Sequence, residues 1–134
     1  GNYTRPQGEV IYLEKNVNST NFHSTANYSD VSITTLNVEA DTNGKIPKGA
    51  KALKMVLMTK DSGTGYYYMH LGGVNDVDTW DVMTLLEGHI ADKYVLDQGW
   101  CNCDVNGDLY YRIDASGRGT LDVGTFRYLA VELN

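Results

Sequence analysis

Aromatic side chains interspersed with Asp and Asn are the residues of this chain whose chemistry best suits a binding site. They are Tyr66, Tyr67, Tyr68, Trp80, Tyr94, Trp100, Tyr110 and Tyr128. Exposed Trp and Tyr rings can stack on the faces of sugars while neighbouring polar groups bind the hydroxyls. The candidate glycan-binding residues are therefore Tyr66, Tyr68, Trp80 and Trp100. The alternative is that Trp80 and Trp100 close the two ends of a hydrophobic core.

The chain carries no recognisable catalytic motif. The phosphate-binding loops, the zinc-protease pattern and the nucleophile elbow are all absent from it. His23, His70 and His89 each stand alone in the sequence, which is typical of ordinary polar residues. We expect a protein that is not an enzyme, with no catalytic residue and no cofactor.

One acidic stretch resembles the start of a calcium-binding loop. Asp104, Asn106 and Asp108 match the first three ligand positions of an EF-hand. Leu109 and Ala115 stand where that loop needs Gly and Glu, so a turn explains these residues better.

Two weaker metal alternatives remain open. Asp76, Asp78 and Asp81 could hold a cation within a loop, and Cys101 with Cys103 could supply two zinc ligands. A disulfide across a single intervening residue is strained, so we expect free thiols and folding in a reducing compartment. No metal ligand is assigned.

Charge is distributed unevenly along the chain. The formal net charge is −6, which argues against a nucleic-acid partner, since phosphates require a basic surface. Residues 43–60 contain five lysines and no acid, whereas residues 75–108 contain eight acids and one lysine. These segments are either two solvated faces or a charge-complementary contact between copies or with a partner. No apolar run is long enough to predict a membrane span.

Alternation of apolar and polar residues predicts strands throughout. It is clearest in residues 105–133, where an Asn106-Gly107 turn is followed by two strands joined by a glycine turn. Leu109, Tyr111 and Ile113 are alternate residues of the first strand and would lie on its buried face. The alternate residues of the second strand that would lie on the same buried face are Leu121, Val123, Leu129, Val131 and Leu133.

Further strands are expected at turn-bounded intervals. Their ranges are 10–13, 31–40 with a bulge, 50–60, 66–71, 80–86, 93–96 and 100–105. Helix competes with strand for residues 50–60 because Ala, Leu, Lys and Met favour it, and for residues 80–90 because of their apolar spacing.

These elements predict an all-β chain folded as an antiparallel, jelly-roll-like β-sandwich with about 8–10 short strands. Residues 1–9 are polar and read as an N-terminal arm, and residues 10–134 as a single β-sandwich domain.

Two stretches resemble β-sandwich domains of bacteriophage and other viral appendage proteins. IPKGAKALKMVLMTKDSG, residues 46–63, is similar to their strand-and-turn, and NGDLYYRIDASGRGTLDV, residues 106–123, to their closing hairpin. The resemblance covers about residues 31–133. It implies a non-enzymatic virion part, such as a fibre tip, head fibre or capsid decoration. Such parts are often trimeric and often touch host-surface glycans.

Two functions from different classes follow. The first is a virion structural protein, assembled in the host cytoplasm, whose arm docks on a neighbour. Its partners would be other virion subunits or copies of itself, a trimer included, with a host-surface glycan as an additional ligand and with no nucleic acid or membrane. The second is a secreted carbohydrate-binding module that uses the aromatic residues as its platform.

Overall fold

The chain contains eight strands and one short helix among the residues that the structure, a computed structural model, describes. Those residues are 8–18, 33–61, 67–76, 78–86, 91–114 and 123–134. The elements are β1 (Glu9–Asn18), β2 (Thr34–Leu36), α1 (Val38–Asp41), β3 (Ala52–Lys60), β4 (Tyr67–Gly72), β5 (Val82–Leu86), β6 (Val95–Asn102), β7 (Leu109–Asp114) and β8 (Val123–Leu133).

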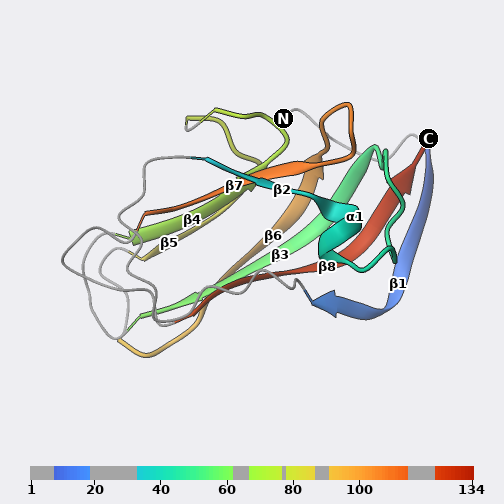
Figure 1. Cartoon of the computed structure of the whole chain (residues 1–134). Coiled ribbons are helices and arrows are strands. Elements are labelled where there is room, and N and C mark those ends of the chain that lie inside the picture. Colours follow the sequence, from blue (N-terminus) through green and yellow to red (C-terminus); the bar gives the residue numbers. More distant parts are fainter. Residues whose placement is uncertain (1–7, 19–32, 62–66, 77, 87–90, 115–122) are drawn as a thin grey trace.

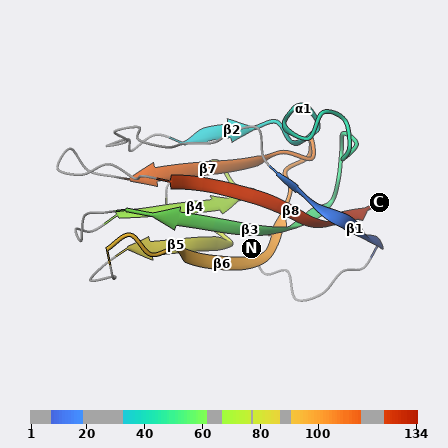
Figure 2. The ribbon, with the colours of Figure 1, turned by 90° about the horizontal axis from the view of Figure 1, so that it is seen from below.

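The strands form two antiparallel sheets packed face to face (Figures 1 and 2). Sheet A has the order β1-β8-β3-β6, and sheet B has the order β2-β7-β4-β5. The first strand therefore pairs with the last, β2 with β7, β3 with β6 and β4 with β5. This nesting arises when one long antiparallel ribbon rolls up, and it is the topology of a jelly roll. The predicted fold class is confirmed.

The core lies between the inner faces of the two sheets. On β3 the inward residues Leu53, Met55 and Leu57 are fully buried. This strict alternation confirms the predicted strand over the competing helix. Two further predictions are confirmed, because residues 82–86 form β5 and residues 67–72 form β4. Residues 87–90 lie outside the described residues.

The predicted pairing of the last two strands is wrong, because β7 and β8 belong to different sheets. Leu109, Tyr111 and Ile113 are buried as expected, but they meet β8 across the core and not beside it. The rings of Tyr111 and Phe126 lie 5.5 Å apart between the sheets. The Asn106-Gly107 turn likewise leads from β6 in sheet A to β7 in sheet B, so it does not close a hairpin.

A bulge in β8 changes which parity faces the core. Phe126 and Tyr128 are fully buried, whereas Leu129, predicted to face inward, is only half-buried. The register with β3 shifts at this point, since Met55 pairs with Tyr128 and Lys54 with Ala130. One extra residue in a strand reverses the alternation beyond it. After the bulge the odd-numbered residue Val131 faces the core, as predicted. Before the bulge it is the even-numbered residues Phe126 and Tyr128 that face the core.

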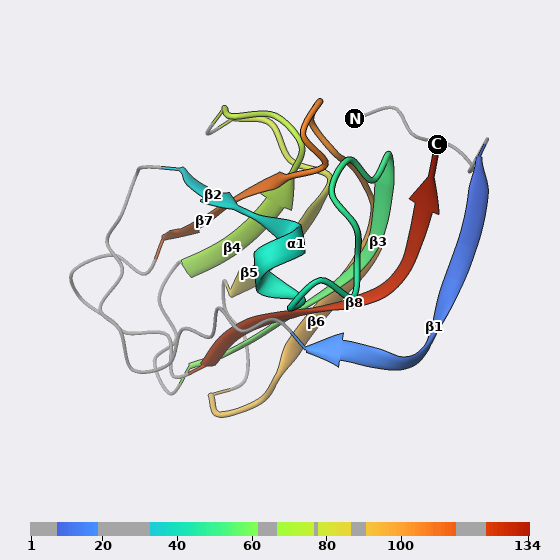
Figure 3. The same cartoon turned by 45° about the vertical axis from the view of Figure 1, so that its right-hand side comes forward.

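Residues 31–40 do not form one bulged strand. Only β2 is extended, and α1 follows it as a single helical turn, which Figure 3 shows between β2 and β8. The side chain of Asn37 accepts a hydrogen bond of 3.1 Å from the Ala40 amide, which caps the helix. The change of phase between Ile33 and Leu36 marks the approach to this capped turn, so the predicted bulge is wrong.

The strands predicted at 93–96 and 100–105 are not separated by a turn, because Asp97-Gln98-Gly99, which has the composition of one, lies inside β6. The Asp97 carboxylate accepts a hydrogen bond of 3.1 Å from the Met83 amide on β5. In return, Asp81 before β5 accepts one of 3.3 Å from the Asn102 amide on β6. Two edge strands of different sheets therefore cap each other, which blocks edges that could otherwise recruit a foreign strand.

At the N-terminus, β1 extends further than the predicted strand of residues 10–13 and pairs with β8 from Glu9 to Asn18. The Gly8 amide donates to the buried carboxylate of Glu132 on β8. The rest of the predicted arm, residues 1–7, lies outside the described residues.

Candidate functional site

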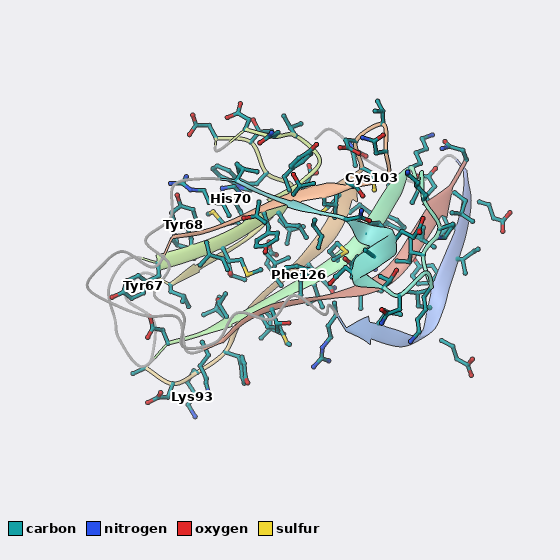
Figure 4. All side chains as sticks on the ribbon, viewed as in Figure 1. Tyr67, Tyr68, His70, Lys93, Cys103 and Phe126 are labelled. Atoms are coloured by element: carbon teal, nitrogen blue, oxygen red, sulfur yellow. The ribbon has the colours of Figure 1, made fainter. Side chains whose placement is uncertain are left out.

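The outer face of sheet B gathers aromatic and basic side chains from β4 and β7. Tyr67, Met69 and Leu71 point into the core, so Tyr68 and His70 lie on the opposite face. Arg112 on β7 is the cross-strand neighbour of His70. Figure 4 shows Tyr68 and His70 along β4.

Three rings on this face stack one after another. The rings of Tyr68 and His70 are 5.7 Å apart and nearly parallel, at 10°. The rings of His70 and Trp80 follow at 5.2 Å and 29°. The Arg112 guanidinium lies 5.3 Å from the centre of the Tyr68 ring. We call these four residues the aromatic stack.

Exposure differs sharply within the aromatic stack. His70 is 1% exposed, covered by its neighbours, whereas Trp80 is 43% exposed. Gly72 allows the Trp80 segment to lie close to β4, because a Cβ at Gly72 would stand 3.1 Å from the Trp80 Cα. The Asp81 amide donates to the Leu71 carbonyl at 2.9 Å and fixes the segment there. The arrangement presents an indole surface on which a flat apolar ligand face can stack.

The structure brings two of the four candidate glycan-binding residues together. Tyr68 and Trp80 belong to the aromatic stack, whereas Trp100 lies on β6 in sheet A, paired with Lys54. Tyr66 lies outside the described residues. Sequence reasoning missed His70 and Arg112. The spacing of His70 two residues after Tyr68 could have indicated a shared strand face, but nothing local links Arg112 to them.

The outer face of sheet A has a different character. Lys54 lies with its Nζ 5.7 Å from the centre of the Tyr12 ring, and Lys60 with its Nζ 5.3 Å from that of Tyr94. Arg127 is on the same side, since its neighbours Phe126 and Tyr128 are buried inward. Leu96 pairs with Met58 on this face. We call the following set the cationic face: Tyr12, Lys54, Lys60, Tyr94, Leu96, Trp100 and Arg127.

The cationic face exposes several large apolar side chains. Tyr12 is 65% exposed, Leu96 57% and Tyr94 52%. Tyr12 and Lys54 are separated in the sheet by Ala130, whose small side chain is fully buried beneath them. An exposed sheet surface of this kind suits contact with another macromolecular surface better than enclosure of a small ligand.

The Asp104 turn organises the chain locally. The Asp104 carboxylate accepts hydrogen bonds from the amides of Asn106 and Asp108, both 2.9 Å, and from the Tyr110 hydroxyl at 2.6 Å. Partial burial opposes ionisation, but these hydrogen bonds prevail and lower the pKa of Asp104. Asp108 accepts from the Val38 amide at 3.2 Å. Turn geometry accounts for these carboxylates, as predicted.

The metal alternatives find no assembled site in the described part of the chain. Within it, no three His, Cys, Asp or Glu side chains come together around a common point. Asp76 bonds within its own loop, to the Asp78 amide and the Thr79 hydroxyl, whereas Asp81 reaches across to β6.

Cys101 and Cys103 are free thiols, as predicted. Cys101 is fully buried, and burial raises its pKa above the ordinary value. Burial, with the nearby Asp104, raises the pKa of Cys103 to about 12. Both thiols are therefore protonated near neutral pH and are poor nucleophiles.

Comparison with known proteins does not place the chain in a family, because no family model and no curated protein matches it. Across the ranges that the structure describes, no helix is long and apolar enough to cross a membrane.

Proposed function

We propose that this chain is a non-catalytic structural subunit of a virion, a capsid decoration or a head- or tail-fibre module assembled in the host cytoplasm. Jelly rolls are common in viral capsid proteins and in lectins, and a fold alone does not determine function. The observation that carries the proposal is the exposure of large apolar side chains on the cationic face, with Tyr94 and Leu96 at its β6 edge and Tyr12 on β1 at the opposite edge. A monomer rarely keeps several large apolar side chains exposed on one surface unless that surface binds something.

The test is the mass of the chain in solution, measured by sedimentation with and without residues 1–7, a truncation that leaves Gly8 and β1 in place. Assembly of the full chain into a defined oligomer supports the proposal, and weaker assembly after truncation would assign a role to the arm. A chain that remains monomeric at the highest soluble concentration, in both forms, contradicts self-assembly.

A second candidate function is glycan binding by the aromatic stack, at a host surface or in a secreted carbohydrate-binding module. The observation in its favour is that Trp80 is 43% exposed while His70 stacks against its ring and Tyr68 stacks against His70. A preorganised ring costs little entropy when a sugar stacks on it.

A glycan array tests this second function. Trp80→Ala should weaken binding at least about tenfold, which is roughly 1.4 kcal/mol. Val105→Ala is the control, because Val105 is 96% exposed and belongs neither to the aromatic stack nor to the cationic face. Absence of binding by the unmodified chain across the array removes the glycan function.

A further inference from the structure

Lys54, Lys60 and Arg127 make the centre of the cationic face basic within an acidic protein. The chain has a formal net charge of −6, yet β3 and β8 direct Lys54, Lys60 and Arg127 to the same side of sheet A. Glu132 is the acid of these two strands on that side. It is fully buried, with its carboxylate 3.7 Å from the Lys51 ammonium and bonded to the Gly8 amide. Its charge is therefore already balanced locally.

Like charges exclude one mode of self-association. In a two-fold symmetric dimer, the same patch meets itself, so Lys54, Lys60 and Arg127 would face their own copies. Such a juxtaposition of like charges is destabilising. A partner of this face must therefore present acidic groups from a different surface.

The chain itself carries such a surface between β4 and β5. Asp76 and Asp78 are both exposed, and we call this pair the acidic turn. Hydrogen bonds from the Asp78 amide and the Thr79 hydroxyl hold the Asp76 carboxylate in place. Figure 1 shows this connection at the upper end of sheet B, away from β8 and β3. Val74 beside it is 50% exposed and supplies apolar contact area.

We propose that the acidic turn of one copy binds the cationic face of a second copy. The contact is heterologous, so repetition closes into a ring if the rotation between copies permits it and otherwise gives an open chain of copies. Tyr12 and Leu96 would contribute apolar contact beneath the charges. This inference rests on the proposed assembly function and specifies the surfaces that carry it.

The size of the cationic face predicts a weak, salt-sensitive contact. Four strands about 4.8 Å apart and about eight residues long offer on the order of 500 Å² in projection. Stable complexes bury roughly 800 Å² on each partner. Charge attraction at such a surface is screened beyond about 8 Å at physiological salt. Association should therefore be sought at high protein concentration and low salt, and should weaken as salt is added.

The decisive experiment is a charge swap, followed by sedimentation. Lys54→Glu with Lys60→Glu should weaken association at least about tenfold, and so should Asp76→Lys with Asp78→Lys. The chain carrying all four substitutions should associate again, because the two surfaces are then complementary with reversed signs. Circular dichroism and thermal unfolding of each variant establish that it is folded.

Lys45→Glu with Lys48→Glu is the matched control, since these exposed lysines lie in the loop before β3 and off the cationic face. It makes the same change in net charge and should leave association within about twofold of the original. If the original chain associates but neither charge reversal weakens it, or the four-fold variant fails to recover, this contact is refuted while the assembly function stands. If the original chain is monomeric, both the proposed contact and the proposed assembly function are refuted.

Discussion

The hydrogen bond between Tyr128 and Asp41 offers the sharpest test of the core. The Tyr128 hydroxyl donates to Asp41 Oδ2 at 2.6 Å, with Tyr128 fully buried and Asp41 3% exposed. It joins β8 to α1, two elements far apart in the sequence. Burial raises the pKa of Tyr128, and the Asp41 hydrogen bond adds to the effect, so the phenol remains a donor at neutral pH.

Tyr128→Phe removes this donor and leaves the shape of the ring unchanged. Hydrogen bonds to charged groups contribute about 1.5–3 kcal/mol, so we expect a loss of about 2 kcal/mol in the free energy of unfolding. For 134 residues, an unfolding entropy of about 2.1 cal/mol/K per residue gives about 280 cal/mol/K. The midpoint of thermal unfolding should therefore fall by about 7 °C.

Tyr110→Phe is the matched control. It removes a Tyr–Asp hydrogen bond of the same length, 2.6 Å to Asp104, but at a half-exposed site. Asp104 keeps two backbone amide donors, so the loss should stay below about 1 kcal/mol. Calorimetry and urea titration measure both variants. Equal losses in the two variants, or a loss below about 0.5 kcal/mol for Tyr128→Phe, would refute the argument that burial sets the magnitude.

Three further predictions test the turns, the sheet edges and the thiols. Gly107→Ala should destabilise by more than Gly44→Ala, for which we expect about 1 kcal/mol, as measured by urea unfolding. Both glycines have φ of +80°, but a Cβ at Gly107 would stand 2.5 Å from a backbone nitrogen whereas Gly44 lies in open space, so equal losses would contradict the crowding. Asp97→Ala should speed hydrogen exchange at the Met83 amide, because it removes the carboxylate that accepts the hydrogen bond of this amide. Asp97→Asn keeps an acceptor and should change the exchange rate less. Unchanged exchange in both variants would show that the hydrogen bond between Asp97 and Met83 is dispensable. Stability should fall above about pH 8.5, where the unfolded chain loses its thiol protons while the folded chain still holds them, because burial raises the pKa of Cys101 and Cys103 in the fold. Cys103 alone should contribute up to about 1.4 kcal/mol per pH unit to this fall. Urea titrations under reducing conditions should show the fall, and Cys103→Ala should lessen it; an identical fall in that variant would assign it to other groups.

Strand positions followed from the sequence wherever local preference and burial agree. Residues 50–60 are a short apolar stretch flanked by turns, so their strand was predictable despite side chains that favour helix, and burial alternates along β3 from Leu53 onward. The Asn43-Gly44 turn has positive φ at both residues, as its composition predicts. The aromatic run beginning at Tyr67 became β4 for the same reason, and it carries Tyr68, one of the candidate residues, to the surface.

Local pattern failed where a distant partner decided the outcome. Asp97-Gln98-Gly99 has the composition of a turn, yet it continues β6 because Asp97 caps β5 and β3 pairs with all three residues. Residues 38–41 have strand-like alternation, yet the Asn37 cap and the Tyr128 hydroxyl favour a helical turn there. In both cases a hydrogen bond to a residue elsewhere in the chain, the Met83 amide for Asp97 and the Tyr128 hydroxyl for Asp41, outweighed the local preference.

By itself, the sequence determined that this chain is built of antiparallel strands with apolar inner faces, because side-chain alternation is a local property. Residue type also suggested Tyr66, Tyr68, Trp80 and Trp100 as binding candidates, and of these Trp80 is exposed and Tyr68 is half-buried. Only the tertiary structure decided that β7 and β8 lie in opposite sheets, that His70 and Arg112 complete the aromatic stack, and that Lys54, Lys60 and Arg127 share one face. Strand partners are chosen by burial and pairing across the whole chain, and no local signal contains that choice.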